Sequence, residues 1–202
     1  INSIYEGTGA EIDGAIGGGA DIIMLPYFKT TAEVESFLSH VNGRVKTMLL
    51  LETVEAVDML DTLVTMPINY YHVGLNDLHL ERNLKFMFEL MSDGTVDKIC
   101  RKLATCNKEY GFGGIAKLGA GMLPAENIIA EHYRLGSSCA ILSRSFCNWE
   151  ASTIDDVAKT FAEEMTKLRK YEAFVSKQNR EFFIDNQIKT YERIKDIARK
   201  MK

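Results

Sequence analysis

The sequence has little of several features that mark specialised classes of protein. Its 202 residues include only 3 Pro and 1 Trp, and its four cysteines show no CxxC spacing. So few and so scattered cysteines argue against a secreted disulfide scaffold and favour a reducing, cytoplasmic setting. No run approaches the roughly 18 apolar residues of a membrane span, so we expect no membrane partner. The net charge of −4 disfavours a nucleic-acid partner.

What is present is the composition of a globular protein, with 46% hydrophobic residues in a chain long enough for one substantial core. Charge is unevenly placed, since residues 1–150 carry a net −7 and the tail from Ala151 carries +3. We therefore divide the chain into a catalytic domain, residues 1–149, and a C-terminal helical extension, residues 150–202. The first residue is Ile rather than Met, so we expect either a processed chain or part of a longer one.

Short apolar runs of strand length recur through the first domain. They are Asp21–Pro26, Val45–Leu51, Tyr70–Gly74, Gly111–Ala116 and Ser138–Leu142. Helical patterns separate these runs, and one of them opens with a capping box of Thr30 and Glu33. Strands that alternate with crossover helices predict a parallel sheet.

The fold class follows from this alternation. A TIM (β/α)8 barrel usually needs about 250 residues, and the first domain is much shorter. We expect the last five to six β/α units of such a barrel, with two to three strands missing or upstream, plus the C-terminal helical extension. The tail carries two apolar stripes, which begin at Ile154 and Ile184. We expect them to pack on the main domain or on a second subunit, as the contact of a homo-oligomer.

Two carboxylates stand where consecutive predicted strands end. Glu52 follows Val45–Leu51, and Asp77 follows Tyr70–Gly74. A strand, a crossover helix and a second strand form a parallel pair whose ends point the same way, with neighbouring strands roughly 5 Å apart. Two anions so placed repel each other unless a positive charge lies between them. A divalent metal ion is the simplest candidate.

Four short motifs occur in order along the first domain. Ile1-Asn2 resembles the end of a V-R-I-N strand, and Gly19–Pro26 resembles a GAD-x-I-M-L-P strand. Leu51–Val57 resembles an (I/L)-E-T-x-x-A-V turn, and Gly74–Leu78 resembles G-x-N-D-L. With these motifs, residues 1 to about 147 resemble the HpcH/HpaI aldolase / citrate lyase beta-subunit family of the phosphoenolpyruvate/pyruvate TIM-barrel superfamily.

The resemblance implies a metal-dependent (class II) carbon–carbon lyase or aldolase that forms or uses a pyruvate-type enolate. It implies that Glu52 and Asp77 bind Mg²⁺ or Mn²⁺ and are the catalytic residues. It also implies that backbone at Leu75, Asn76 and Asp77 meets the carboxylate of a 2-oxo acid. Mg²⁺ suits such a site, because it is bound through few protein carboxylates and leaves positions for waters and substrate.

The sequence departs from the family in three ways. The arginine that polarises the oxo group would stand just before Ile1, and the acidic and histidine residues of the first two strands are absent from this chain. Gly74-Leu75 replaces the Gly-Pro of the aldolase branch. The alternatives are therefore a citrate-lyase-like enzyme acting on an acyl thioester rather than an aldehyde, a phosphoenolpyruvate-utilising domain, and a non-catalytic, metal-binding oligomeric barrel.

Three further residues lie near predicted strand ends. Arg144 follows the last strand, where it would bind a substrate carboxylate or phosphate or form a salt bridge at the barrel rim. Lys117 has the same two interpretations. His79 is either a proton donor or a structural loop histidine.

Overall fold

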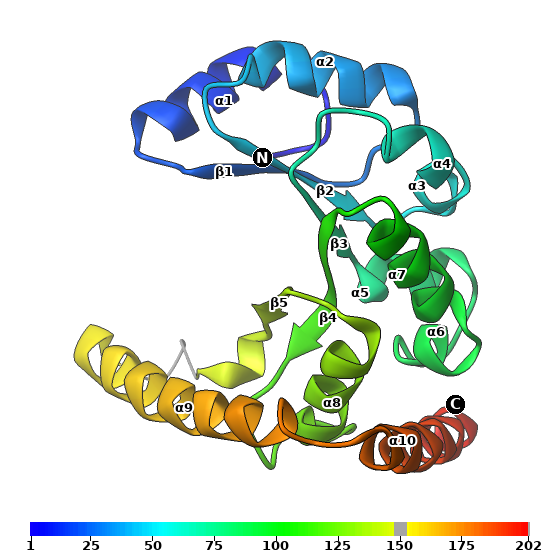
Figure 1. Ribbon diagram of the computed structural model, residues 1–202. Helices are drawn as coiled ribbons and strands as arrows, with labels where there is room; N and C mark the ends of the chain where they lie inside the picture. Colours follow the sequence, from blue (N-terminus) through cyan, green and yellow to red (C-terminus); the bar gives the residue numbers. More distant parts are fainter. Residues whose placement is uncertain (148–152, 202) are drawn as a thin grey trace.

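The computed structural model describes residues 1–147 and 153–201. Over this part of the chain, five parallel strands form one sheet in the order β1-β2-β3-β4-β5, which curls into a half-barrel (Figure 1). The strands are β1 (Ile22–Leu25), β2 (Lys46–Leu51), β3 (Tyr70–Val73), β4 (Glu109–Ile115) and β5 (Cys139–Leu142). The predicted α/β fold with helical crossovers is confirmed. The strands expected upstream stay a prediction.

Helices precede the first strand and connect each strand to the next. They are α1 (Thr8–Gly17), α2 (Thr31–Val41), α3 (Val54–Asp58), α4 (Leu60–Leu63), α5 (Leu75–Glu81), α6 (Glu89–Ser92), α7 (Thr95–Thr105) and α8 (Ala125–Leu135). After β5 come the 3-10 helix η1 (Arg144–Phe146), α9 (Ile154–Val175) and α10 (Arg180–Lys200). The predicted capping box is present, since the Thr30 side chain accepts from the Glu33 amide and the Glu33 side chain accepts from the Thr30 amide.

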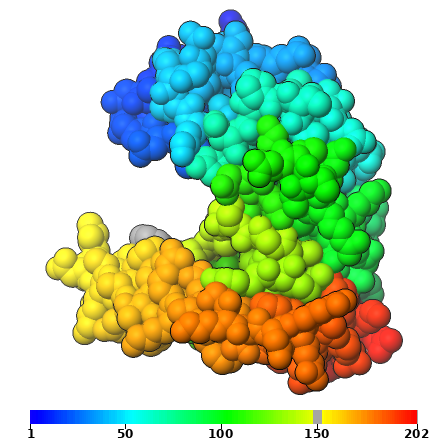
Figure 2. Space-filling view, in the orientation of Figure 1, coloured from blue at the N-terminus to red at the C-terminus, as the bar shows by residue number. Residues whose placement is uncertain are grey.

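The core lies between the sheet and the helices on its outer face. Thr47, Leu49 and Leu51 of β2 are buried, whereas Met48 and Leu50, which alternate with them, are only half-buried. This alternation is expected of a strand with one covered and one open face. The open face is concave, and Figure 2 shows the molecule hollowed between its N-terminal part and α9.

Two backbone features set the ends of helices between the strands. The helical segment after Glu52 is broken at Met59 into α3 and α4. α7 ends at Thr105, because Asn107 adopts a left-handed conformation (φ +52°) that stops the helix. The residues after β3, where His79 was considered as a loop histidine, form α5.

The glycines of β4 allow a close approach to β5. A Cβ on Gly111 would lie 2.0 Å from the carbonyl oxygen of Cys139, so no side chain fits there. The pairing of the two strands is also irregular between Gly111 and Gly114. The sequence places small residues where this edge of the half-barrel needs them.

The C-terminal helices pack on the outside of the half-barrel. α10 contacts α8 and α6, and α9 contacts α8. The predicted stripes are only partly buried: Ile194 is buried, whereas Ile154 is 87% exposed. The predicted domain boundary at 149/150 lies outside the described residues. No helix in the described part of the chain is long and apolar enough to cross a membrane.

A buried ion-pair network fixes α10 in place. Arg134 of α8 donates to both carboxylate oxygens of Asp97 of α7, at 2.9 and 2.8 Å. The Tyr191 hydroxyl of α10 donates to Asp97 at 3.0 Å, and Arg134 also pairs with the fully buried Glu131. One arginine and one tyrosine thus tie three helices together.

Candidate metal centre

The two predicted carboxylates stand at the carboxyl ends of adjacent parallel strands. Leu51 of β2 and Val73 of β3 are register partners, and the Gly74 amide donates to the Leu51 carbonyl at 3.0 Å. Glu52 follows Leu51 directly, and Asp77 lies in the first turn of α5, three residues after Gly74. The predicted placement of both residues at one end of the sheet is therefore found in the structure.

Glu52 is held in a tight, buried position. Its side chain is 6% exposed, and its Oε1 accepts a hydrogen bond from the Tyr27 amide at 2.9 Å. A Cβ on Gly74 would lie 2.9 Å from Oε2 of Glu52 and 2.6 Å from its Cβ. The glycine before α5 thus leaves the space that the carboxylate occupies.

Electrostatics bring Glu52 and Asp77 into one unit. Burial, with a smaller contribution from the negative charge of Asp77, raises the pKa of Glu52 to about 7, while the hydrogen bond from the Tyr27 amide opposes the rise. Glu81 adds a smaller repulsion. The two carboxyl groups are therefore close enough to repel each other, and a cation between them would relieve both this repulsion and the cost of burying a charge.

The donor set fits a hard divalent cation that keeps open positions. Within residues 1–147 and 153–201, no group of three or more His, Cys, Asp and Glu side chains is arranged to hold a metal ion. Two carboxylates are nevertheless a normal protein contribution to a Mg²⁺ site, in which waters and substrate complete an octahedron.

Sequence reasoning missed a second group of residues beside this pair. Glu81, one turn after Asp77 on α5, accepts from the Val54 amide at 2.8 Å and from Lys29 Nζ at 3.1 Å. The hydrogen bond from Val54, followed by that from Lys29, holds the pKa of Glu81 below its ordinary value, so Glu81 is an anion at neutral pH. The Tyr27 hydroxyl also donates to Glu81, at 3.3 Å.

The remaining residues of the Asp77 motif divide between core and surface. The Leu75 side chain is 1% exposed and packs beside Gly113 of β4, so only its backbone is available to a ligand. Asn76 is exposed, and Asp77 is half-buried. Leu75, Asn76 and Asp77 form the first turn of α5, whose amides have no acceptor within the helix.

The other candidates are exposed or serve the structure. Arg144 is exposed in η1, and within the described residues it forms no ion pair. Lys117 is exposed after β4. His79 is buried, and its Nδ1 bonds to the Leu75 carbonyl at 3.2 Å, which agrees with a structural histidine.

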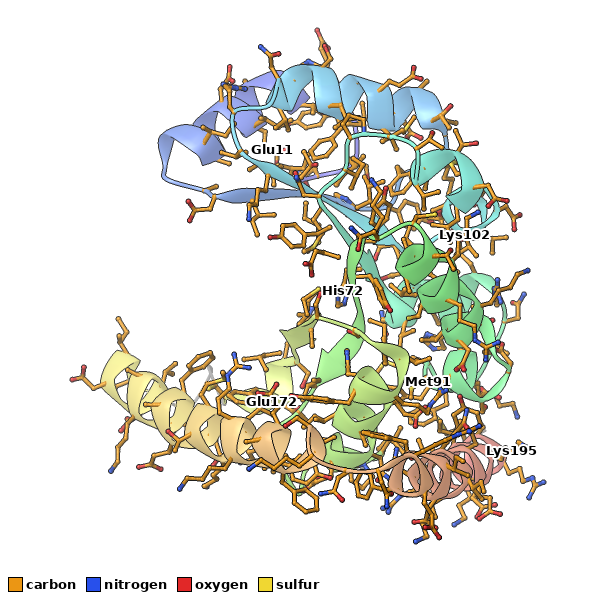
Figure 3. All side chains as sticks on the ribbon, in the orientation of Figure 1. Glu11, His72, Met91, Lys102, Glu172 and Lys195 are labelled. Atoms are coloured by element: carbon orange, nitrogen blue, oxygen red, sulfur yellow. The ribbon has the colours of Figure 1, made fainter. Side chains whose placement is uncertain are left out.

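His72 of β3 lies near the middle of the half-barrel (Figure 3). Its Nε2 donates to the Gly113 carbonyl of β4 at 3.0 Å, and burial lowers its pKa to about 4. His72 is therefore a neutral group that joins two strands.

Comparison with known protein families finds no family that matches this sequence. Comparison with curated proteins likewise finds no significant match.

Proposed function

We propose that this protein binds Mg²⁺ or Mn²⁺ between Glu52 and Asp77 and acts as a metal-dependent carbon–carbon lyase on a pyruvate-type 2-oxo acid. One observation carries the proposal: two carboxyl groups that follow the ends of adjacent strands are close enough to repel each other, and one of them is buried with its pKa raised to about 7. Buried titratable pairs with strongly shifted pKa values are typical of functional sites.

The chemistry assigns a separate task to each residue. When bound, the cation would act as a Lewis acid for the enolate that forms beside the carbonyl of the oxo acid. Glu52 and Asp77 would hold the cation, and the Tyr27 amide keeps Glu52 in place. First-turn amides of Leu75–Asp77 would orient the substrate carboxylate.

The strand ends also favour a site at this edge. In parallel α/β barrels, active sites are built from the residues that follow the carboxyl ends of the strands. Glu52, Asp77 and Tyr27 each follow the carboxyl end of a different strand. This location supports the lyase proposal more than a site on the outer, helical face would.

Metal binding and turnover test the proposal in two steps. Mn²⁺ should bind the protein with one site per chain, and Glu52→Gln and Asp77→Asn should each weaken binding by at least about tenfold, since each removes a ligand charge. Glu55→Gln is the matched control, because Glu55 is an exposed glutamate in the first turn of α3, three residues after Glu52.

Oxaloacetate decarboxylation, a reaction that passes through an enolate, is the activity assay. The lyase proposal expects Mn²⁺-dependent decarboxylation that both ligand variants lose. If the protein binds Mn²⁺ but does not decarboxylate oxaloacetate, the lyase proposal is wrong and the alternative of a non-catalytic, metal-binding barrel is favoured. Equal Mn²⁺ binding by the wild type and both ligand variants would refute the site itself.

A further inference from the structure

We propose that Glu81 is the positioning residue of this site: it fixes the segment after β1 and the start of α3 so that Glu52 is aimed at Asp77. The inference rests on the proposed function for its consequence, although its geometry does not involve a metal. Asp77 and Glu81 are four residues apart on α5 and so lie on one face of the helix.

Glu81 connects the three segments that follow β1, β2 and β3. Its Oε1 accepts from Lys29 and from the Tyr27 hydroxyl, both after β1, and its Oε2 accepts from the Val54 amide, the first residue after the N-cap of α3. Glu81 itself is carried by the helix that follows β3. Because both oxygens are engaged, Glu81 is a poor metal ligand and a good anchor.

Tyr27 is the link between Glu81 and Glu52. Its amide donates to Oε1 of Glu52, and its backbone has φ +46°, a left-handed conformation that is strained for a non-glycine residue. Such strain persists only when surrounding contacts hold it. The Tyr27 ring is half exposed, so the core does not supply these contacts.

Two contacts that converge on Glu81 hold Tyr27 instead. The tyrosine hydroxyl bonds to Glu81 directly, and Lys29 Nζ, which pairs with Glu81, lies 5.3 Å from the centre of the tyrosine ring. A cation at this distance from the face of a ring is attracted to it. Removal of Glu81 would therefore take away the partner of the tyrosine hydroxyl and one of the two carboxylates that hold Lys29 beside the ring.

The Glu81 carboxylate also holds the residues that follow Glu52 in the sequence. Thr53 follows Glu52, and its hydroxyl donates to the Phe28 carbonyl at 2.8 Å. Val54 comes next and donates its amide to Glu81. Glu52 thus lies between two segments that Glu81 connects, which restricts its backbone as well as its carboxylate.

Glu55 offers a matched control. It also pairs with Lys29, at 3.3 Å, but within the described residues it accepts no bond from Tyr27 or from the Val54 amide. Glu55→Gln and Glu81→Gln each remove one negative charge from the same lysine. Only the second variant also changes the group that accepts from the Tyr27 hydroxyl and the Val54 amide.

The first experiment measures hydrogen exchange of the Tyr27 amide in the metal-free protein by NMR. Glu81→Gln should speed this exchange by about tenfold or more, because local opening controls it, whereas Glu55→Gln should leave it within twofold. Tyr27→Phe, which removes only the hydroxyl, should give an intermediate increase. Unchanged exchange in Glu81→Gln, or equal increases in both glutamine variants, would overturn the inference.

The second experiment measures Mn²⁺ affinity of the same variants. Loss of a residue that orients a ligand typically costs about 10–100-fold in metal affinity, and we expect this for Glu81→Gln with one site retained. Glu55→Gln should bind as the wild type does. Wild-type affinity in Glu81→Gln would overturn the positioning role.

The two experiments separate the two proposals. A wild-type protein that binds no Mn²⁺, yet shows faster Tyr27 exchange in Glu81→Gln, would refute the proposed function and leave the positioning of Glu52 intact. Melting temperatures identify a variant that is merely unfolded. Glu81→Asp, which keeps the charge and shortens the reach, would then show whether exchange follows the contact or the charge.

Discussion

Gly74 lies directly against Glu52: a Cβ on the glycine would come within 2.6 Å of the glutamate Cβ and 2.9 Å of its Oε2. The Gly74 backbone has φ −79°, which any residue can adopt. Its lack of a side chain therefore matters for space and not for conformation.

Gly74→Ala should displace Glu52 and lower Mn²⁺ affinity by at least about tenfold, with a stability loss of about 1–3 kcal/mol from overpacking. Titration with Mn²⁺ and urea unfolding measure the two effects. Gly14→Ala in α1, where a Cβ meets nothing within 4 Å, is the control. It should leave metal binding unchanged and raise stability by about 0.4–1 kcal/mol. Wild-type Mn²⁺ affinity in Gly74→Ala would contradict the close packing.

Glu52→Gln should stabilise the metal-free protein at high pH while it abolishes metal binding. The folded pKa of Glu52, about 7, lies above its ordinary value of 4.5, so the folded state favours the protonated form. Its contribution to stability is complete below pH 4.5 and is lost as the pH rises through 7.

Glutamine does not ionise, so at pH 8 Glu52→Gln should exceed the wild type in stability by up to roughly 3 kcal/mol. Below pH 4.5 the two proteins should be alike. Urea unfolding in a chelator at pH 8 and pH 4.5 measures this difference. If Glu52→Gln is less stable than the wild type at pH 8, the ionised Glu52 carboxylate is stabilised by its surroundings, and the prediction is wrong.

Two buried histidines should make the protein sensitive to acid. Burial lowers the pKa of His72 to about 4 and that of His132 to about 3, and the neighbouring His72 contributes to the second shift. For a histidine whose folded pKa is depressed, stability is complete above the ordinary value of 6.5 and is lost as the pH falls toward the folded value.

In a Glu52→Gln background, which removes the opposing titration, unfolding between pH 6.5 and 4.5 should take up about two protons. The free energy of unfolding should then fall by about 2.7 kcal/mol per pH unit. His72→Gln should halve this slope. A slope that does not change in His72→Gln would assign the acid sensitivity to other groups.

Arg134→Ala should strongly destabilise the contact of α10 with α7 and α8. It leaves the buried Glu131 without a cation and Asp97 with only the exposed Arg101, and breaking a buried pair costs about 3–5 kcal/mol. Arg101→Ala is the control, since Arg101 pairs with the same Asp97 but its side chain is 77% exposed. It should cost less than about 1 kcal/mol. Equal losses would show that the network does not hold α10.

Much of the fold could be predicted because its signals are local. The apolar runs of β2 and β3 and the Thr30 capping box each depend on residues a few positions apart. α5 was missed because Gly74-Leu75-Asn76-Asp77 has the composition of a turn. Tertiary burial of Leu75 and Leu78, which local propensity does not contain, supports this short helix.

The site was predicted only where strand ends define it. Glu52 and Asp77 follow apolar runs, so their shared location could be inferred from topology. Glu81 and Tyr27 could not, because their hydrogen bond joins positions 54 residues apart, and the left-handed backbone of Tyr27 has no local signal. Arg144 follows a strand as well, but its distance from the pair depends on the curvature of the sheet.

The most direct test of the central claim is a crystal structure of the protein grown with Mn²⁺, with anomalous diffraction recorded at the manganese edge. We predict one strong anomalous peak within about 2.0–2.3 Å of carboxylate oxygens from both Glu52 and Asp77, near the length of bonds to hard divalent cations. A structure without such a peak, or with manganese bound elsewhere and the two carboxylates pointing apart, would contradict the account.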